Sequence, residues 1–235
     1  MLLQANDLGR LLAIYISQTT LSIIFLYIAY KILRRNRNRL TIILSGFYLA
    51  EAFAFIINAI LVQFRVNPLV FLLYFIVIFL VLFGQIFLVL FNLFLYKLEA
   101  NIPTKRLMIY ISIYAILIFS ILYFPNGMAI NEQTDWRPVW SWSFLIIMFI
   151  FSSCFIVIPF VILFIKMYRK FEDKVLKKKM RYFFIGFWGV VLGYFGGMLY
   201  VTWNDPFFRA IWNIVSLCMI IPSCVLIYYG IGSEL

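Results

Sequence analysis

The sequence predicts an all-α membrane protein, in which seven transmembrane helices form a single bundle over residues 1–235. Composition is the first observation behind this prediction: 66% of the residues are hydrophobic and 12% are charged, whereas soluble domains carry about 25% charged residues. Length is the second, because seven apolar stretches each approach the roughly 20 residues that a helix needs to cross ~30 Å of hydrocarbon. The third is an alternation of basic and nearly neutral loops, which is typical of the two sides of a membrane protein.

The apolar stretches place the spans in order along the chain. Residues 11–32 are expected to form a first span rather than a signal peptide, because the basic start, short apolar core and cleavage site of a signal are missing. The second span, 40–63, carries Glu51 near its midpoint, and the third, 69–96, is long enough to tilt. The remaining spans are residues 107–124, 141–165 with Pro159 inside, 182–203 and 207–231.

The distribution of lysine and arginine predicts the orientation of the bundle. Sixteen of the 20 basic residues belong to the first, third and fifth loops and their flanks, and the other four lie on the opposite side. The positive-inside rule puts the larger set in the cytoplasm. We therefore expect a multi-pass protein of the cell membrane with its N-terminus outside and its C-terminus in the cytoplasm.

Charge and residue types exclude several classes of function. The net charge of +11 is explained by basic loops that meet anionic lipid headgroups, and no groove or motif indicates a nucleic-acid partner. The chain has no histidine, and its three cysteines lie within apolar spans without metal-binding spacing. No paired carboxylates or nucleophile motif are present for chemistry. We expect no cofactor, no metal site and no enzymatic activity.

Glu51 is the one ionisable residue expected at mid-membrane depth. A charged group there costs about 2.5 kcal/mol or more unless it is paired or neutralised, and no buried lysine or arginine is expected nearby. Helical periodicity places Tyr48 and Asn58 on the stripe of Glu51, while Gln85 and Asn92 form a second stripe on the third span. These five residues are the candidate intramembrane site.

Two of these residues are predicted to lie at the same depth in the membrane. Glu51 and Gln85 each lie about 11 residues from the inner ends of their spans, which is ~16 Å at 1.5 Å per residue. We expect them to hydrogen-bond or to share a water, with the carboxyl in its neutral form. Two interpretations account for the pair: a polar contact that holds the two helices together, and a site for a ligand, a proton or an ion.

The sixth span carries glycines at intervals of four residues: Gly189, Gly193 and Gly197. Small residues at that spacing let two helix backbones approach closely in lipid. We expect this face to be buried against another helix, either inside the monomer or across a homodimer.

A basic segment joins the fifth and sixth spans. Asp173 stands four residues from both Arg169 and Lys177, which favours a helix that continues the spans into the cytoplasm. A cytoplasmic partner or lipid headgroups would meet its cations, which are Arg169, Lys170, Lys174, Lys177, Lys178 and Lys179.

Tryptophans gather on the opposite side of the predicted bundle, at Trp136, Trp140, Trp142, Trp203 and Trp212. Interfacial anchoring explains them without a ligand. The alternative interpretation makes the loop 125–140 a lid over a cavity between helices.

The layout of the chain is similar to a known class of membrane module. Seven spans with an outer N-terminus, the basic loop RRNRNR, a turn with proline after the fourth span and the stretch LKKKMRYFFIGFWGVVLGYFGGMLY resemble the seven-helix N-terminal sensor region of prokaryotic membrane histidine kinases. The resemblance implies an input module for an apolar or membrane-borne signal. Because this sequence lacks the kinase part, the resemblance also implies a separate signalling partner in the cytoplasm.

Three functions therefore stay open. The first is a receptor or sensor-type input module that acts through a partner. The second is a proton- or cation-coupled transporter or channel, which would also use buried polar residues on neighbouring helices. The third is a structural subunit of a membrane complex. A single buried ionisable group and the lack of a clear inverted repeat favour the first over the second.

Overall fold

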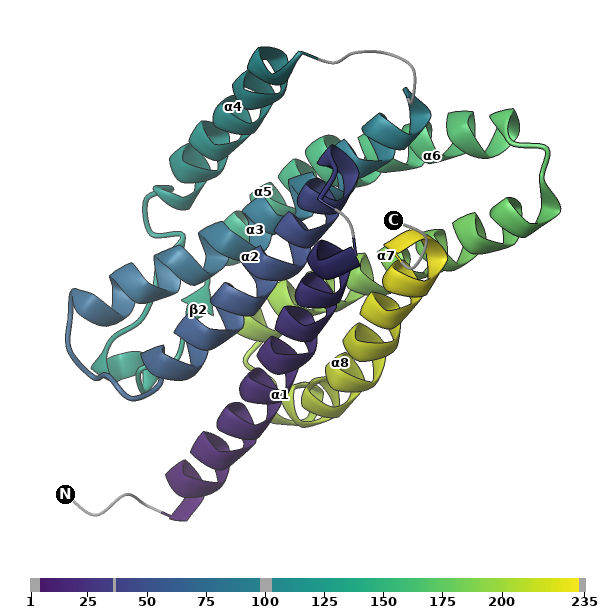
Figure 1. Cartoon of the computed structure of the whole chain (residues 1–235). Coiled ribbons are helices and arrows are strands. Elements are labelled where there is room, and N and C mark those ends of the chain that lie inside the picture. Colours follow the sequence, from purple (N-terminus) through teal and green to yellow (C-terminus); the bar gives the residue numbers. More distant parts are fainter. Residues whose placement is uncertain (1–4, 36, 98–102, 233–235) are drawn as a thin grey trace.

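A computed structural model describes the backbone of residues 5–35, 37–97 and 103–232, and the side chains of these ranges from residue 15 onward. Seven helices in these ranges are long and apolar enough to cross a membrane, which confirms the prediction of an all-α protein with seven spans. Figure 1 shows them as one bundle, in which α1 begins at the lower end and α8 runs toward the opposite end.

The first half of the chain forms four helices close to the predicted spans: α1 (Ala5–Arg35), α2 (Arg39–Leu61), α3 (Leu69–Tyr96) and α4 (Thr104–Leu122). Asn38 starts α2, because its Oδ1 accepts a hydrogen bond from the Thr41 amide at 2.8 Å and satisfies a donor that the helix leaves free. The largest difference from the prediction is at α1, which runs past both ends of the expected span 11–32.

The fifth predicted span is not one regular helix. It consists of α5 (Trp142–Ser152), a π-helical turn (Ser153–Val157) and α6 (Ile158–Lys170). The π turn lies directly before Pro159, which has no amide hydrogen to donate and whose ring would collide with the preceding turn of an α-helix. A wider turn at this place accommodates the proline, so the expected kink takes the form of a π bulge.

The last two spans are α7 (Lys174–Thr202) and α8 (Pro206–Ile227), and a π-helical turn (Tyr228–Gly232) follows α8. The basic connection before α7 differs from the expected continuous helix. The chain leaves helical geometry after Lys170, and Asp173 Oδ1 accepts a hydrogen bond from the Val175 amide at 2.9 Å. Asp173 thus caps α7 at its positive end, where a carboxylate is favoured, instead of pairing with its neighbours along a helix.

The loop between α4 and α5 folds into a small hairpin. Its strands, β1 (Met128–Ala129) and β2 (Val139–Trp140), are antiparallel, and a 3-10 turn (Glu132–Thr134) lies between them. Trp140 is buried here, and its Nε1 donates a hydrogen bond to the Tyr74 hydroxyl of α3 at 3.0 Å. The expectation of an interfacial anchor is therefore wrong for Trp140, because the hairpin turns its indole onto α3.

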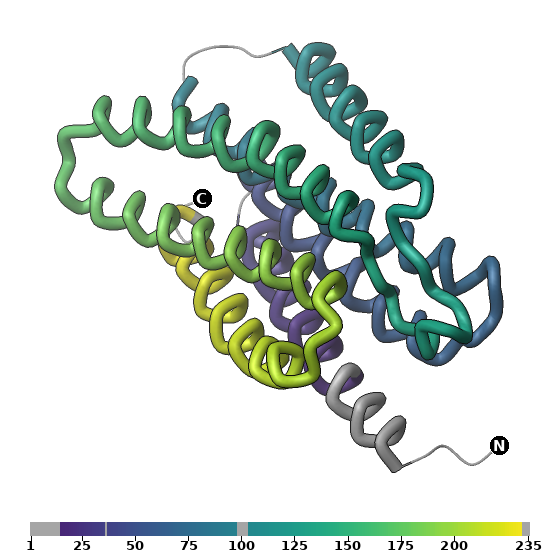
Figure 2. The backbone as a smooth tube through the Cα atoms, turned by 180° about the vertical axis from the view of Figure 1, so that it is seen from behind, coloured from purple at the N-terminus to yellow at the C-terminus, as the bar shows by residue number. Residues whose placement is uncertain are grey.

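The helices are packed unevenly around α2. This helix lies against α1 and α3 and buries a larger share of its side chains than any other described span. The ends of α6 and α7 form a long hairpin that projects past the neighbouring helices, and α4 stands apart from the rest in both views (Figures 1 and 2).

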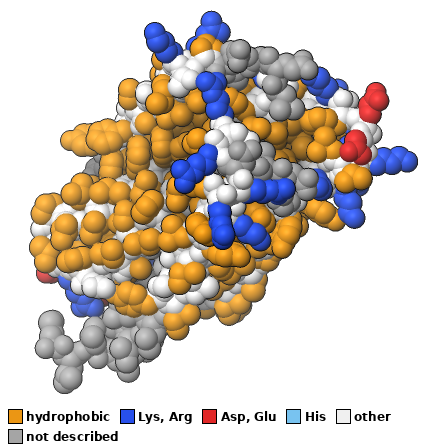
Figure 3. All heavy atoms as spheres, viewed as in Figure 1, with side chains coloured by type: hydrophobic (Ala, Val, Ile, Leu, Met, Phe, Trp, Pro, Cys, Tyr) orange, Lys and Arg blue, Asp and Glu red, His pale blue; other side chains and the backbone are white. Residues whose placement is uncertain are grey.

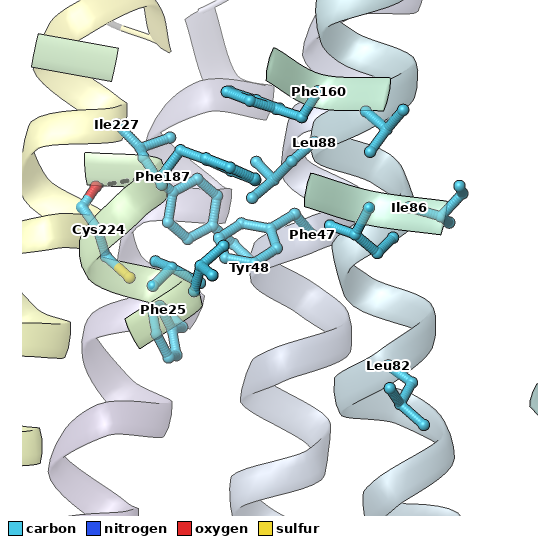
Figure 4. Packing of buried hydrophobic residues seen from close by; sticks show 14 of the residues in the cluster. Phe25, Phe47, Tyr48, Leu82, Ile86, Leu88, Phe160, Phe187, Cys224 and Ile227 are labelled. Atoms are coloured by element: carbon cyan, nitrogen blue, oxygen red, sulfur yellow. Dashed lines mark hydrogen bonds between the residues drawn. The ribbon is translucent and has the colours of Figure 1, made fainter. Parts of the chain in front are cut away.

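Aromatic side chains fill the centre of the bundle (Figure 4). Phe160 of α6 and Phe187 of α7 stack with 3.4 Å between ring centroids. Tyr48 of α2 is fully buried beside Phe25 of α1, with 5.9 Å between their ring centroids. The rings of Phe91 on α3 and Phe183 on α7, with 5.7 Å between their centroids, join helices that are far apart in the sequence.

Candidate functional site

Glu51 lies in the interface between α2 and α3, and only 6% of its surface is exposed. The α3 residue beneath its carboxyl is Gly84. A methyl group at Gly84 would stand 3.4 Å from Glu51 Oε1 and 3.2 Å from the Cβ of Ala50. The missing side chain therefore lets α3 lie close to Ala50 of α2, and the Glu51 carboxyl lies beside Gly84.

Gln85 is buried, but no hydrogen bond joins it to Glu51 among the described residues. The predicted direct bond is therefore not formed. The reason is helical register: successive residues of an α-helix are about 100° apart, so when Gly84 faces Glu51, Gln85 belongs to another face of α3.

Two of the other three predicted residues form hydrogen bonds to helices other than α2 and α3. Asn92 is fully buried and donates from Nδ2 to the Phe160 carbonyl of α6 at 3.0 Å. Tyr48 donates from its hydroxyl to the Cys224 carbonyl of α8 at 2.8 Å, the bond drawn in Figure 4. Asn58 is half-buried. The two predicted stripes consequently connect α2 to α8 and α3 to α6, and they do not form one site.

Two residues that the sequence analysis missed extend the site around Glu51. Tyr194 of α7 is half-buried with its hydroxyl shielded from solvent, and this hydroxyl lies within electrostatic range of the Glu51 carboxyl and beside the Ser152 hydroxyl of α5. Neither Tyr194 Oη nor Ser152 Oγ has a hydrogen bond of acceptable geometry in the described structure, although both are shielded from solvent. Buried hydroxyls normally have a partner, so these two atoms have unused capacity to donate and accept.

We call Glu51, Ser152 and Tyr194 the central polar cluster. Further tyrosines surround it. Tyr114 of α4 and Tyr74 of α3 also interact electrostatically with Tyr194. Both are satisfied: the Tyr114 hydroxyl donates to the Leu82 carbonyl at 3.1 Å, and the Tyr74 hydroxyl accepts from Trp140. Helices α2, α5 and α7 thus contribute the cluster itself, while α3 and α4 contribute its border.

The side chains of the central polar cluster can form hydrogen bonds and can bind a proton. A carboxyl and two hydroxyls offer oxygen donors and acceptors and no nucleophile with an adjacent base. Within the described ranges, no three histidine, cysteine, aspartate or glutamate side chains gather as metal ligands.

The sequence contained a weak signal for the missed residues. Tyr194 stands between Gly193 and Gly196, deep in a span, although tyrosines of membrane helices are enriched at the interfaces. Ser152 and Ser153 form a short polar pair at the start of the π turn.

The glycine face of α7 packs against α8 inside the monomer, with a register that differs from the prediction. A Cβ at Gly189 would collide with Ser223, and one at Gly193 would stand 2.9 Å from Ile220 Cγ1. Gly197 has no atom within 4 Å of such a Cβ, whereas Gly186 and Gly196 do contact α8. Gly197 is therefore not part of this contact within the monomer. Steps of four residues drift by about 40° around a helix, and alternating steps of three and four stay on one face.

The predicted cytoplasmic cations gather at the tip of the α6–α7 hairpin. Arg169 and Lys170 end α6, and the first two turns of α7 carry Lys174, Lys177, Lys178 and Lys179. Lys177 Nζ lies 5.7 Å from the ring centroid of Tyr168 across the hairpin, in a cation–π contact. Contact of this tip with a partner or with lipid stays a prediction.

Comparison with family models, with curated proteins and with solved structures gives no match for this chain.

Proposed function

We propose that the chain is a receptor-type input module of the cell membrane, which responds at the central polar cluster and acts through a separate cytoplasmic partner. The observation that carries the proposal is that the Tyr194 hydroxyl lies within electrostatic range of the buried Glu51 carboxyl and beside the Ser152 hydroxyl, and that neither hydroxyl has a hydrogen bond in the described structure. Intramembrane ionisable residues are rare and are usually functional. The resemblance of the span layout to sensor regions of membrane histidine kinases supports the same class.

The elements that carry the cluster also lead to the predicted partner surface. Tyr194 belongs to α7, which continues without a break to the lysines at the hairpin tip. Ser152 directly precedes the π turn and α6, which end at the same tip. A ligand or proton that changes the hydrogen bonding of Glu51 would shift α5 against α7, and helix shifts of about 1–2 Å are a common switching motion.

The proposal includes an orientation with the hairpin tip in the cytoplasm. Figure 3 shows lysine and arginine side chains at the top, in the middle and at the right of this face, and few at its lower end. This distribution supports an N-terminus outside and a C-terminus inside.

Glu51→Gln tests the proposal, because glutamine keeps the shape of the side chain but cannot ionise. Spin labels at Arg35→Cys on α1 and Lys174→Cys on α7, both exposed, report the position of the hairpin in nanodiscs. Cys154 and Cys218 are exposed and are replaced by alanine in all variants. We expect Glu51→Gln to move the distance distribution by roughly 1–2 Å or more, and Tyr194→Phe to move it in the same direction.

Glu132→Gln is the matched control, since this carboxyl is exposed in the outer hairpin and should leave the distances unchanged. Equal distributions for the parent and Glu51→Gln would reduce Glu51 to a packing residue and contradict the proposal. Proteoliposomes with a trapped pH dye test the transporter alternative. A proton flux in the parent protein that Glu51→Gln abolishes would favour a transporter over a receptor.

A further inference from the structure

A second feature lies away from the central polar cluster. A groove of about 520 Å³ runs between α4 on one side and α3 and α6 on the other, where α4 stands apart in Figure 1. This volume falls in the range of small-molecule sites, which is about 300–1,000 Å³. Its walls are almost entirely apolar, with Leu90, Leu93 and Leu163 as examples.

One end of the groove is cationic. Lys97 at the end of α3 and Arg106 in the first turn of α4 line it, and both side chains are exposed. Neither forms an ion pair within the described structure, and none of the described acidic residues lines the groove. Two cations at the mouth of an apolar groove complement a ligand with one anionic end and a hydrocarbon body.

The length of the groove matches one membrane leaflet. On α3 its lining runs from Lys97 to Ile86, which is ~16 Å at 1.5 Å per residue. Half of a ~30 Å hydrocarbon core is about the same depth. An acyl chain whose headgroup lies at the basic end would therefore fill the groove along its whole length.

We infer that this groove binds an anionic phospholipid from the leaflet at the basic end of the bundle. Its phosphate lies between Lys97 and Arg106, and one acyl chain lies between α4 and the α3–α6 pair. Basic pockets between transmembrane helices on the cytoplasmic side are typical sites for anionic lipid headgroups. Phe155 belongs to the π turn and lines the groove, so the lipid contacts the same irregular segment that follows Ser152. The inference does not depend on the proposed receptor role.

The test is native mass spectrometry of the purified full chain with added dioleoyl phosphatidylglycerol or dioleoyl phosphatidylcholine, which share their acyl chains. We expect the parent to bind the anionic lipid more tightly. In the double variant Lys97→Ala/Arg106→Ala, binding of phosphatidylglycerol should become about thirtyfold weaker and approach that of phosphatidylcholine. Lys105→Ala is the matched control, because Lys105 is an exposed cation beside Arg106 that does not line the groove.

A second pair of variants tests the apolar part. Ile113 and Ile116 are both exposed on α4, at 50% and 64%, but only Ile113 lines the groove. We expect Ile113→Trp to weaken binding of both lipids about fivefold or more by filling the groove, and Ile116→Trp to have no effect. Thermal midpoints measured without added lipid show that each variant is folded. Equal binding of the two lipids by the parent, or a loss of binding in Lys105→Ala as large as in the double variant, would overturn the inference and indicate non-specific attraction at the basic face.

Discussion

The α7–α8 contact and the α3–α4 contact join neighbouring helices in opposite ways. On α7, Gly186, Gly189 and Gly193 have no side chain to keep α8 away, so atoms of α8 occupy the space where a Cβ would stand. Helix α4 has no glycine. It meets α3 through the Tyr114 hydrogen bond and through the rings of Phe75 and Phe119, whose centroids are 5.3 Å apart.

The difference shows what holds helices together in lipid. Helix α4 carries a row of large apolar side chains that stay exposed, namely Met108, Ile109, Ile113, Ile116 and Phe119. In water such a row would drive the helix onto the bundle, but lipid tails are equally apolar and give no such force. Close approach of backbones and specific hydrogen bonds remain, so α7–α8 forms a tight interface and α4 is held by a few contacts.

Gly189→Leu should break the tighter contact and have the largest effect. A Cβ at this position already collides with Ser223, so α7 and α8 must separate. Overpacking of this kind costs about 3 kcal/mol, which corresponds to a fall of about 6 °C or more in the thermal midpoint of a chain of this size. At Gly197 on the same helix a Cβ meets no atom within 4 Å, so Gly197→Leu should change the midpoint little. Equal midpoints for both variants would mean that the glycines do not set the α7–α8 distance.

Trp140→Phe should have an intermediate effect, because it removes one strong polar contact between the hairpin and α3. The Tyr74 hydroxyl loses its buried donor, and a smaller ring leaves space beside α3. We expect a loss of about 1–3 kcal/mol in the free energy of unfolding. Trp142→Phe is the control, since Trp142 is exposed two residues later. A double-mutant cycle with Tyr74→Phe isolates the bond, and a coupling energy of zero would contradict it.

Tyr114→Phe should have the smallest effect, and it tests how strongly α4 is held against α3. The phenylalanine keeps the ring that stacks on Phe151 and removes only the hydroxyl that donates to Leu82. Hydrogen bonds between membrane helices average ~0.6 kcal/mol, so the thermal midpoint should fall by about 1–2 °C. Tyr123→Phe, at an exposed tyrosine just after α4, should leave the midpoint unchanged. A loss as large as that of Gly189→Leu would show that α4 is packed as tightly as α8.

The spans could be predicted from the sequence because the transfer of an apolar segment into lipid is a local property. The burial of Glu51, Gln85 and Asn92 followed in the same way from their depth within the spans. Rotation about the helix axes could not be predicted so closely. Gly84 rather than Gln85 faces Glu51, and Gly196 rather than Gly197 meets α8, since each choice depends on where the partner helix lies.

The central polar cluster was missed for a related reason. Ser152 and Tyr194 are 42 positions apart in the sequence, and hydroxyl side chains are common in membrane helices. Only the three-dimensional arrangement of the helices brings Tyr194 within electrostatic range of Glu51 and beside Ser152. Pro159 did indicate an irregular fifth span, but a proline alone does not specify a π turn.

The two arms of the α6–α7 hairpin differ in regularity. Helix α7 is unbroken for 29 residues, or ~43 Å, so Tyr194 and Lys177 belong to one continuous helix. The other arm is interrupted, because the π turn lies between Ser152 and α6. Under the proposed function, a shift of α7 at Tyr194 would carry the lysines at the tip with it, whereas the π turn would let α6 move separately from α5.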